Sequence, residues 1–380
     1  HSAVYVRPDR HAAQGTCSNA ITVTREADSG AGTLRQAIAD ICPGGVITID
    51  VSEVALTSVG DTSEGDSALG IDKAVTIVGN DSVIKRDDVI APEFRLFYID
   101  SSGALTLPHT TLRNGAVSNS SGGPNGGQIV SNSAGGNDFG GGGIFISLAS
   151  SRNVTLTVEN SAVSHNLSGN GGAGLYVRIG SGAFTFAITE TEFISNSTAG
   201  KGEGGGIAIW ASSGSSIQGR LNRSLVADNK SKGSGGGINV GGAGTIALDI
   251  INTTLSGNWT QGDGGGLYAQ SGTINLYNVT VYTNTADYDG NSTGDGGGLA
   301  DSGSTTTLSN TLVAGNHDGG GAARPDISGS FDSEGYNLIG EDVGGGWAGP
   351  PSDQVGASGS PIDPLLGPLQ DNGGPTWTHA

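Results

Sequence analysis

The sequence has little of several residue types, and each shortage narrows the classes of protein to which it can belong. Charged residues make up only 14% of the 380 residues, with 17 basic against 36 acidic ones and a net charge of −19. This balance argues against nucleic acids and anionic membrane surfaces as partners. Methionine is absent. No apolar run reaches the roughly 18 residues that indicate a membrane-spanning segment.

Cysteine is also scarce, since Cys17 and Cys42 are the only two. In an exported protein they would form one disulfide that closes an N-terminal loop, and two buried thiols are the alternative. A chain that begins at His1 without an initiator methionine is typical of a mature protein whose signal peptide has been removed, and equally of a trimmed one. We therefore expect a secreted or cell-surface protein.

Glycine, in contrast, is abundant at 69 residues, and it recurs in a fixed phrase. Glycine-rich triplets precede an aliphatic residue six times, as in GGGIAIW and GGGLYA. Their last glycines are 29 to 32 residues apart: Gly143, Gly174, Gly206, Gly237, Gly266 and Gly298. A period of this length is typical of repeat architectures in which each repeat stacks on the next.

Two further marks share this period. One is an asparagine that closes a short apolar phrase, and it occurs at Asn166, Asn196, Asn229, Asn258, Asn284 and Asn316. The other lies six residues earlier, at Asn160, Glu190, Arg223, Asn252, Asn278 and Asn310. Short segments with alternating apolar residues lie between the marks, such as Ile246, Leu248 and Ile250.

These features predict an all-β fold, a right-handed parallel β-helix with about 30 residues and about three strands in each coil. Glycine suits a corner where the backbone turns through positive φ and lies close to the neighbouring coil. The repeated asparagines should stack into a ladder, each amide bonded to the next.

The regular repeat defines three regions. Residues 1–50 should form an N-terminal extension and cap, with a short helix around Leu34–Ile41 that begins after Thr33 as its N-cap. Residues 51–340 should form the β-helix, interrupted by a loop at about 121–140. Residues 341–380 are irregular and should pack on the last coil or leave it.

Several stretches resemble known bacterial surface proteins. TREADSGAGTLRQAI, at 24–38, resembles the N-terminal signature of proteins named for a CSLREA-like motif, and DNGGPTWTHA, at 371–380, is similar to their C-terminal part. The GGGI phrases and FISN, at 193–196, are similar to repeats of polymorphic outer-membrane proteins. The resemblance implies a right-handed β-helix, export and a surface location, and it implies no reaction.

Enzymes of this fold place their catalytic residues together on one outer face. A lyase would need calcium-binding carboxylates beside a basic residue, for which Arg178, Arg220 and Arg223 are candidates, and a hydrolase would need close carboxylates. The sequence shows neither arrangement in phase with the repeat. We therefore expect no catalytic residues, and we retain a polysaccharide lyase or hydrolase as the alternative.

Two weaker patterns concern ligands. Asp287, Asp289, Asn291 and Asp295 occupy positions 1, 3, 5 and 9 of a calcium-loop pattern, but Gly298 stands where its glutamate is expected. The expected cofactor is thus none, or Ca²⁺ in this acidic loop, with a solvated loop as the plainer interpretation. The second pattern is a set of aromatic residues that would form a strip for sugars if they all face outward: Trp210, Trp259, Tyr268 and Tyr282.

These observations favour a structural or adhesive surface protein. Its partners would be copies of itself, assembled end to end or side by side, or surface glycans and proteins. A glycan-binding module without catalysis is a further alternative, and it differs from an enzyme because it leaves its ligand intact.

Overall fold

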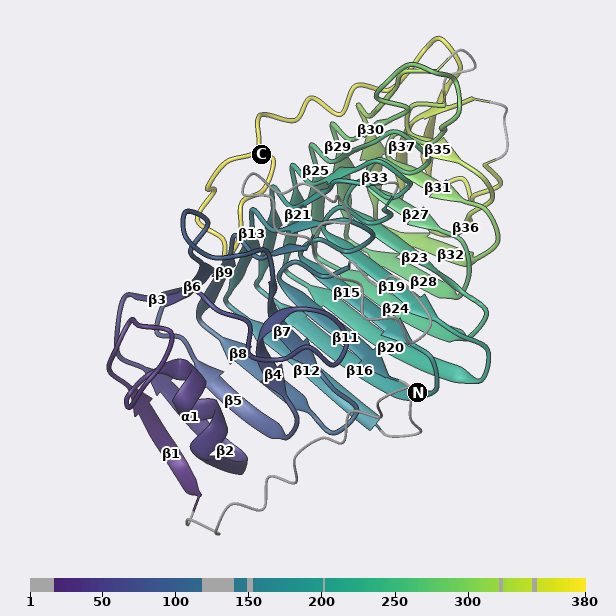
Figure 1. Cartoon of the computed structure of the whole chain (residues 1–380). Coiled ribbons are helices and arrows are strands. Elements are labelled where there is room, and N and C mark those ends of the chain that lie inside the picture. The colour runs from purple at the N-terminus through teal and green to yellow at the C-terminus, as the bar shows by residue number, and fades with distance from the viewer. Residues whose placement is uncertain (1–16, 118–139, 149–152, 201, 321–323, 344–346) are drawn as a thin grey trace.

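The computed structural model describes residues 17–117, 140–148, 153–200, 202–320, 324–343 and 347–380, and these residues form a parallel β-solenoid of about ten turns (Figure 1). The one helix of this part of the chain is α1 (Leu34–Asp40). Each strand pairs in parallel with its equivalent in the next coil, as Ile188 in one coil pairs with Leu221 in the next. The fold class expected from the sequence is therefore confirmed.

Each regular coil contains four strands rather than the three expected, and they contribute in turn to four sheets, which we call C, A, B and D. The fourth strand was missed because it has only two residues, as in Lys230–Ser231.

Sheets A and B have 11 strands each. Sheet A contains β1 (Ser18–Val23), β2 (Ile41–Ile49), β5 (Ala74–Val78), β8 (Ala104–Pro108), β12 (Asn153–Glu159), β16 (Gly182–Thr189), β20 (Ser215–Asn222), β24 (Thr245–Ile251), β28 (Thr273–Tyr277), β32 (Thr305–Ser309) and β36 (Asp332–Gly335). Sheet B contains β3 (Glu53–Leu56), β6 (Ser82–Arg86), β9 (Thr110–Arg113), β13 (Ala162–Ser164), β17 (Glu192–Ile194), β21 (Leu225–Ala227), β25 (Thr254–Ser256), β29 (Thr280–Tyr282), β33 (Leu312–Ala314), β37 (Leu338–Asp342) and β38 (Gln354–Ala357).

Sheets C and D have nine and seven strands. Sheet C contains β4 (Ser67–Ile71), β7 (Arg95–Ile99), β11 (Ile144–Leu148), β15 (Leu175–Ile179), β19 (Ile207–Ala211), β23 (Ile238–Gly242), β27 (Leu267–Ala269), β31 (Leu299–Asp301) and β35 (Ile327–Ser328). Sheet D contains β10 (Ala116–Val117), β14 (Leu167–Ser168), β18 (Ser197–Thr198), β22 (Lys230–Ser231), β26 (Trp259–Thr260), β30 (Thr285–Ala286) and β34 (His317–Asp318).

The core consists of aliphatic columns that run along the axis of the solenoid. One column in sheet A contains Ile188, Leu221, Ile250, Leu276 and Leu308, which are paired coil to coil and buried. Burial of each such side chain contributes roughly 1.5–3 kcal/mol. Because a coil covers its neighbours on both sides, no coil can bury these residues alone.

The glycine triplet forms the corner between sheets D and C. Its first residue has positive φ, for example 69° at both Gly204 and Gly235. Its last residue lies close to the next coil, because a Cβ placed on Gly237 would lie 2.6 Å from the carbonyl oxygen of Gly266. Both requirements favour glycine, and the structural role expected of the triplet is confirmed.

The six repeated asparagines form one continuous buried ladder between sheets B and D. In the first five, the backbone N–H and side-chain Nδ2 donate to Oδ1 of the next asparagine, with Nδ2–Oδ1 distances of 2.9–3.0 Å. Nδ2 also donates to a backbone carbonyl of the preceding coil, as in Asn229 to Phe193. Asp326 ends the ladder, since its Oδ1 accepts both donors of Asn316.

The residues six positions before the ladder mark the corner between sheets A and B, and all have positive φ. Asparagine tolerates this conformation better than most residues. Where Glu190 and Arg223 replace it, φ is still 51° and 48°, and the two side chains form an ion pair.

The solenoid begins earlier than expected from the sequence. Strand β1 already pairs with β2, and β2 pairs with β5, so regular stacking starts at Ser18 rather than at residue 51. A disulfide joins Cys17 to Cys42 across these first strands. Helix α1 caps the coil with buried Leu34, Ala37 and Ile38, and Thr33 is its N-cap as predicted.

The C-terminal segment first packs on the last coil and then leaves it, so it takes both of the paths considered from the sequence. Strand β38 adds to β37, and Phe331 and Trp347 pack against the core at this end. The chain then returns along the outside of sheet B, past several coils, instead of remaining at the last one (Figure 1). Its His379 reaches Ser256 in β25, with 2.9 Å between Nε2 and Oγ. The expected loop at 121–140 lies, apart from Gly140, outside the described residues.

Candidate functional site

The acidic loop at 287–295 is organised by its own backbone. Both carboxylate oxygens of Asp287 accept backbone N–H groups, from Asn291 at 3.0 Å and Ser292 at 2.7 Å. The Asp289 carboxylate accepts Nδ2 of Asn291. No three His, Cys, Asp or Glu residues of the described chain are grouped as a metal site requires. In the loop considered for Ca²⁺, both carboxylate oxygens of Asp287 are thus used to hold the backbone of the turn.

Further carboxylates line the same corner and are used in the same way. Asp263 accepts the N–H of Asp295, and Asp318 accepts those of Gly320 and Arg324. Burial, together with the negative charges of Asp295 and Asp318, raises the pKa of Asp263 even though it accepts the N–H of Asp295. These carboxylates therefore stabilise the turns by accepting backbone N–H groups.

The four predicted aromatic residues do not form one strip. Trp210 and Tyr268 lie in sheet C, Trp259 in sheet D and Tyr282 in sheet B. Trp259 stacks on Tyr288, with ring centroids 4.4 Å apart, and Tyr282 packs edge-on against His379. The expectation was wrong because the alternation of strand residues gives the direction of a side chain but not which of four faces it occupies.

The basic residues considered for a lyase are equally dispersed. Arg178 is in β15 of sheet C, Arg220 is in β20 of sheet A, and Arg223 is at the corner that follows, paired with Glu190. They do not share the outer face that a lyase mechanism requires.

A pocket on the outer face of sheet C is the strongest candidate for a ligand site. Along this face, one outward column contains Tyr98, Phe145 and Tyr176 in successive coils, with ring centroids 5.5–5.9 Å apart. The next residue of the column is Ala208, followed by Asn239. The small alanine side chain leaves a hollow of about 180 Å³.

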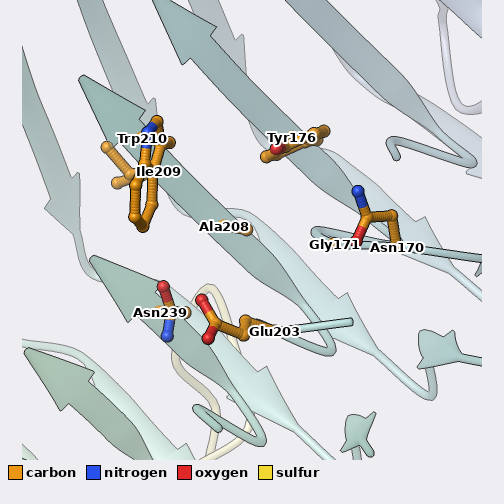
Figure 2. A pocket seen from close by; sticks show the side chains of 8 residues that line it. All are labelled: Asn170, Gly171, Tyr176, Glu203, Ala208, Ile209, Trp210 and Asn239. Atoms are coloured by element: carbon orange, nitrogen blue, oxygen red, sulfur yellow. The ribbon is translucent and has the colours of Figure 1, made fainter. Parts of the chain in front are cut away.

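Polar and aromatic side chains surround this hollow (Figure 2). Trp210 flanks it from the adjacent outward position of β19 and is 36% exposed. Figure 2 shows the amide of Asn239 and the carboxylate of Glu203 next to each other on one side of Ala208, with Tyr176 on the other side. Asn239 is only 1% exposed.

Neighbouring residues hold the walls in place. The carboxylate of Glu203 accepts Nε2 of Gln270 at 3.3 Å. The indole of Trp210 lies over Gly241, since a Cβ on Gly241 would be 2.9 Å from Cζ3 of that tryptophan. Burial raises the pKa of Glu203, with the Gln270 hydrogen bond opposing it. Burial, assisted by the charge of Glu203, raises the pKa of Tyr176 to about 12.

Sequence reasoning identified Trp210 but missed its partners. Glu203 directly precedes a glycine triplet, where the equivalent residues of other coils are Gly140, Gly171, Ser234, Asp263 and Asp295. Asn239 replaces an outward tyrosine or alanine of its column. A comparison of equivalent outward positions from coil to coil would have identified Asn239 as a departure from the repeat, but not Glu203, whose position is also acidic in two later coils.

A second hollow, of about 420 Å³, lies between sheet B and the returning C-terminal segment. It is bordered by Ser256 and Tyr282 on the sheet side and by Trp377 and His379 on the segment side. This groove is formed by contact between two parts of the same chain.

No helix in the described ranges combines the length and apolar character needed to cross a membrane. In comparisons with family models, curated proteins and solved structures, nothing matched the chain. The resemblance to bacterial surface proteins therefore stays a prediction.

Proposed function

We propose that the chain is a secreted or cell-surface β-solenoid that serves as a structural and adhesive scaffold, and that it binds surface glycans without cleaving them. The observation that carries this proposal is the pocket on sheet C. It combines an exposed tryptophan with a buried amide donor and a carboxylate acceptor, and it lies on the side of a rigid stack.

Export is supported by the disulfide between Cys17 and Cys42, because such bonds persist in oxidising compartments. The net charge of −19 favours neutral or cationic ligands over anionic ones.

Binding without cleavage is favoured over hydrolysis by the number of acids in the pocket. Glycoside hydrolases use two carboxylates, about 5–10 Å apart, on either side of the bond that breaks. Glu203 is the only carboxylate among the described residues that line this pocket. A lyase is disfavoured because Arg178, Arg220 and Arg223 lie on different faces.

A single solenoid is favoured over an end-to-end stack. At one end α1 covers the core, and at the other Phe331 and Trp347 pack against it. Stacking through the interior would require these caps to move.

A retention assay tests the proposal. The protein is mixed with insoluble neutral and acidic polysaccharides, and both the protein left in solution and the newly formed reducing ends are measured. We expect depletion by at least one neutral polysaccharide with no new reducing ends. Release of shortened chains would instead establish the enzyme, and no depletion by any polymer would exclude glycan adhesion.

A further inference from the structure

The amide of Asn239 is the most informative group of the sheet C pocket. Its Nδ2 is the one buried side-chain nitrogen or oxygen in the described chain that has no hydrogen-bond partner. Leaving such a buried donor unpaired is destabilising. Asn239 lines the pocket, so a half-turn of its amide about the Cβ–Cγ bond would bring Nδ2 to face the hollow, where an acceptor atom of a ligand would satisfy it.

Glu203 supplies the complementary function. Its carboxylate can accept hydrogen bonds and cannot donate them while ionised. Gln270 already holds the side chain from one side, so the group is oriented before a ligand arrives. A ligand that bonds to both residues must therefore offer a donor and an acceptor close together.

Trp210 adds an apolar surface to these two polar groups. It is 36% exposed, and the absence of a side chain at Gly241 allows its indole to lie against the sheet. Gln270 also approaches Gly241 from the next coil, so the indole is confined. Aromatic surfaces of this kind suit a ligand with one apolar face and polar edges.

These requirements select one chemical class. An anion would be repelled by Glu203, and a simple ammonium ion offers no acceptor for Asn239. A hydroxyl group both donates and accepts, and a pyranose ring carries adjacent hydroxyls around a face of C–H groups. The volume of about 180 Å³ is below the roughly 300 Å³ at which pockets for drug-sized ligands begin, and it suits one ring.

We propose that this pocket binds a single uncharged pyranose ring of a surface glycan. The ring stacks on Trp210, one hydroxyl oxygen accepts from Nδ2 of Asn239, and a hydroxyl of the ring donates to Glu203. This inference rests on the proposed glycan adhesion and identifies the residues and sugar class responsible for it.

Calorimetric titration with hexose oligosaccharides tests the inference. The ligands are neutral oligomers of glucose, galactose and mannose, with a galacturonate oligomer of equal length as the charged comparison. We expect at least one neutral oligomer to bind and the galacturonate to bind at least about tenfold more weakly.

Three substitutions test the named contacts. Trp210→Ala should weaken binding by tenfold or more, which about 1.4 kcal/mol of lost stacking would produce. Glu203→Gln should weaken it several-fold. Tyr288→Ala is the matched control, because Tyr288 is also an exposed aromatic residue but stacks on Trp259, away from the pocket, and its loss should leave the affinity unchanged.

Asn239→Leu separates a binding role from a structural one. If Asn239 serves the ligand, replacing its unpaired amide by an apolar side chain of similar size should weaken binding about tenfold while the melting temperature stays equal or rises. A lower melting temperature with unchanged affinity would overturn the assignment.

The remaining outcomes distinguish the two proposals. If a polysaccharide retains the protein but Trp210→Ala and Asn239→Leu bind it as well as the parent chain does, adhesion stands and this pocket is rejected. If no glycan is bound by the parent chain in either assay, both proposals are wrong.

Discussion

The side chains of Asn258 and Asn284 are joined by a buried hydrogen bond of 2.9 Å, in which Nδ2 of Asn258 donates to Oδ1 of Asn284. The backbone N–H of Asn258 donates to the same oxygen at 3.0 Å. The bond repeats from coil to coil along the ladder, so the Oδ1 atom of each asparagine after Asn166 accepts from two buried donors of the preceding one. The ladder therefore links coils through side chains in addition to the strands themselves.

Asn258→Ala should be strongly destabilising. It removes the acceptor of both the backbone N–H and Nδ2 of Asn229, which are buried. At about 1–3 kcal/mol for each unsatisfied donor, we expect a loss of roughly 2–5 kcal/mol, measured as the free energy of unfolding in urea.

Asn275→Ala is the matched control for that substitution. Asn275 points outward from β28 and makes one partly buried bond to Asp249, so its loss should cost less than about 1 kcal/mol. Equal effects of the two substitutions would show that the ladder has no special role in stability.

Gly237→Ala tests the close approach at the corner between sheets D and C. The added methyl would lie 2.6 Å from the carbonyl oxygen of Gly266, so adjacent coils must move apart. We expect a loss of about 1–3 kcal/mol, read from the urea midpoint. Gly374→Ala, where the nearest atom would be 3.5 Å away, should be nearly neutral. A neutral Gly237→Ala would contradict the close packing of the corners.

Removal of the disulfide should loosen the first coil. The double substitution Cys17→Ser and Cys42→Ser opens a link across a sequence separation of 25 residues, which contributes about 3 kcal/mol in the chain-entropy account. Hydrogen exchange should speed up in β1 and β2 and remain unchanged in β28, which serves as an internal control. Uniform acceleration in all coils would indicate that the solenoid unfolds as one unit.

Asp326 should make stability depend on pH. Burial raises the pKa of this carboxyl from 3.8 to about 6, against the opposing hydrogen bonds from Asn316. Between these values the folded chain holds a proton that the unfolded chain has lost. Its contribution to stability therefore falls as pH rises through this window, by about 3 kcal/mol in total, and is constant above it.

Asp326→Asn isolates this contribution. As pH rises from roughly 4 to 7, the unfolding free energy of the parent chain should fall by up to about 3 kcal/mol more than that of the variant does. A difference that does not change with pH would show that Asp326 keeps an ordinary pKa.

The sequence predicts the features that repeat, and it does so because repetition exposes them. The ladder asparagines, the corner glycines and the inward columns recur in phase. A role inferred for a residue in one coil is therefore supported by the same residue type at the equivalent position of the other coils. A second ladder of hydroxyl groups follows the same logic but was missed, although Ser and Thr follow most of the corner residues. In it the N–H of Thr191 donates to Oγ of Ser224 at 3.2 Å.

The candidate pocket could not be predicted in this way, because it consists of exceptions to the repeat. It exists where Ala208 interrupts an aromatic column and where Gly241 leaves room for an indole. Outward positions are not constrained by the core, so their alternation says little about which side chains meet. The path of the C-terminal segment was unpredictable for a related reason, since it has no period and docks on coils far from it in sequence.

A crystal structure with a bound oligosaccharide, prepared from whichever neutral polysaccharide retains the protein, is the most direct test of the account. We predict an intact oligosaccharide with one ring stacked on Trp210 and a hydroxyl oxygen within hydrogen-bond distance of Nδ2 of Asn239. A ring bound instead in the groove beneath Trp377 and His379, or a shortened sugar chain, would contradict it.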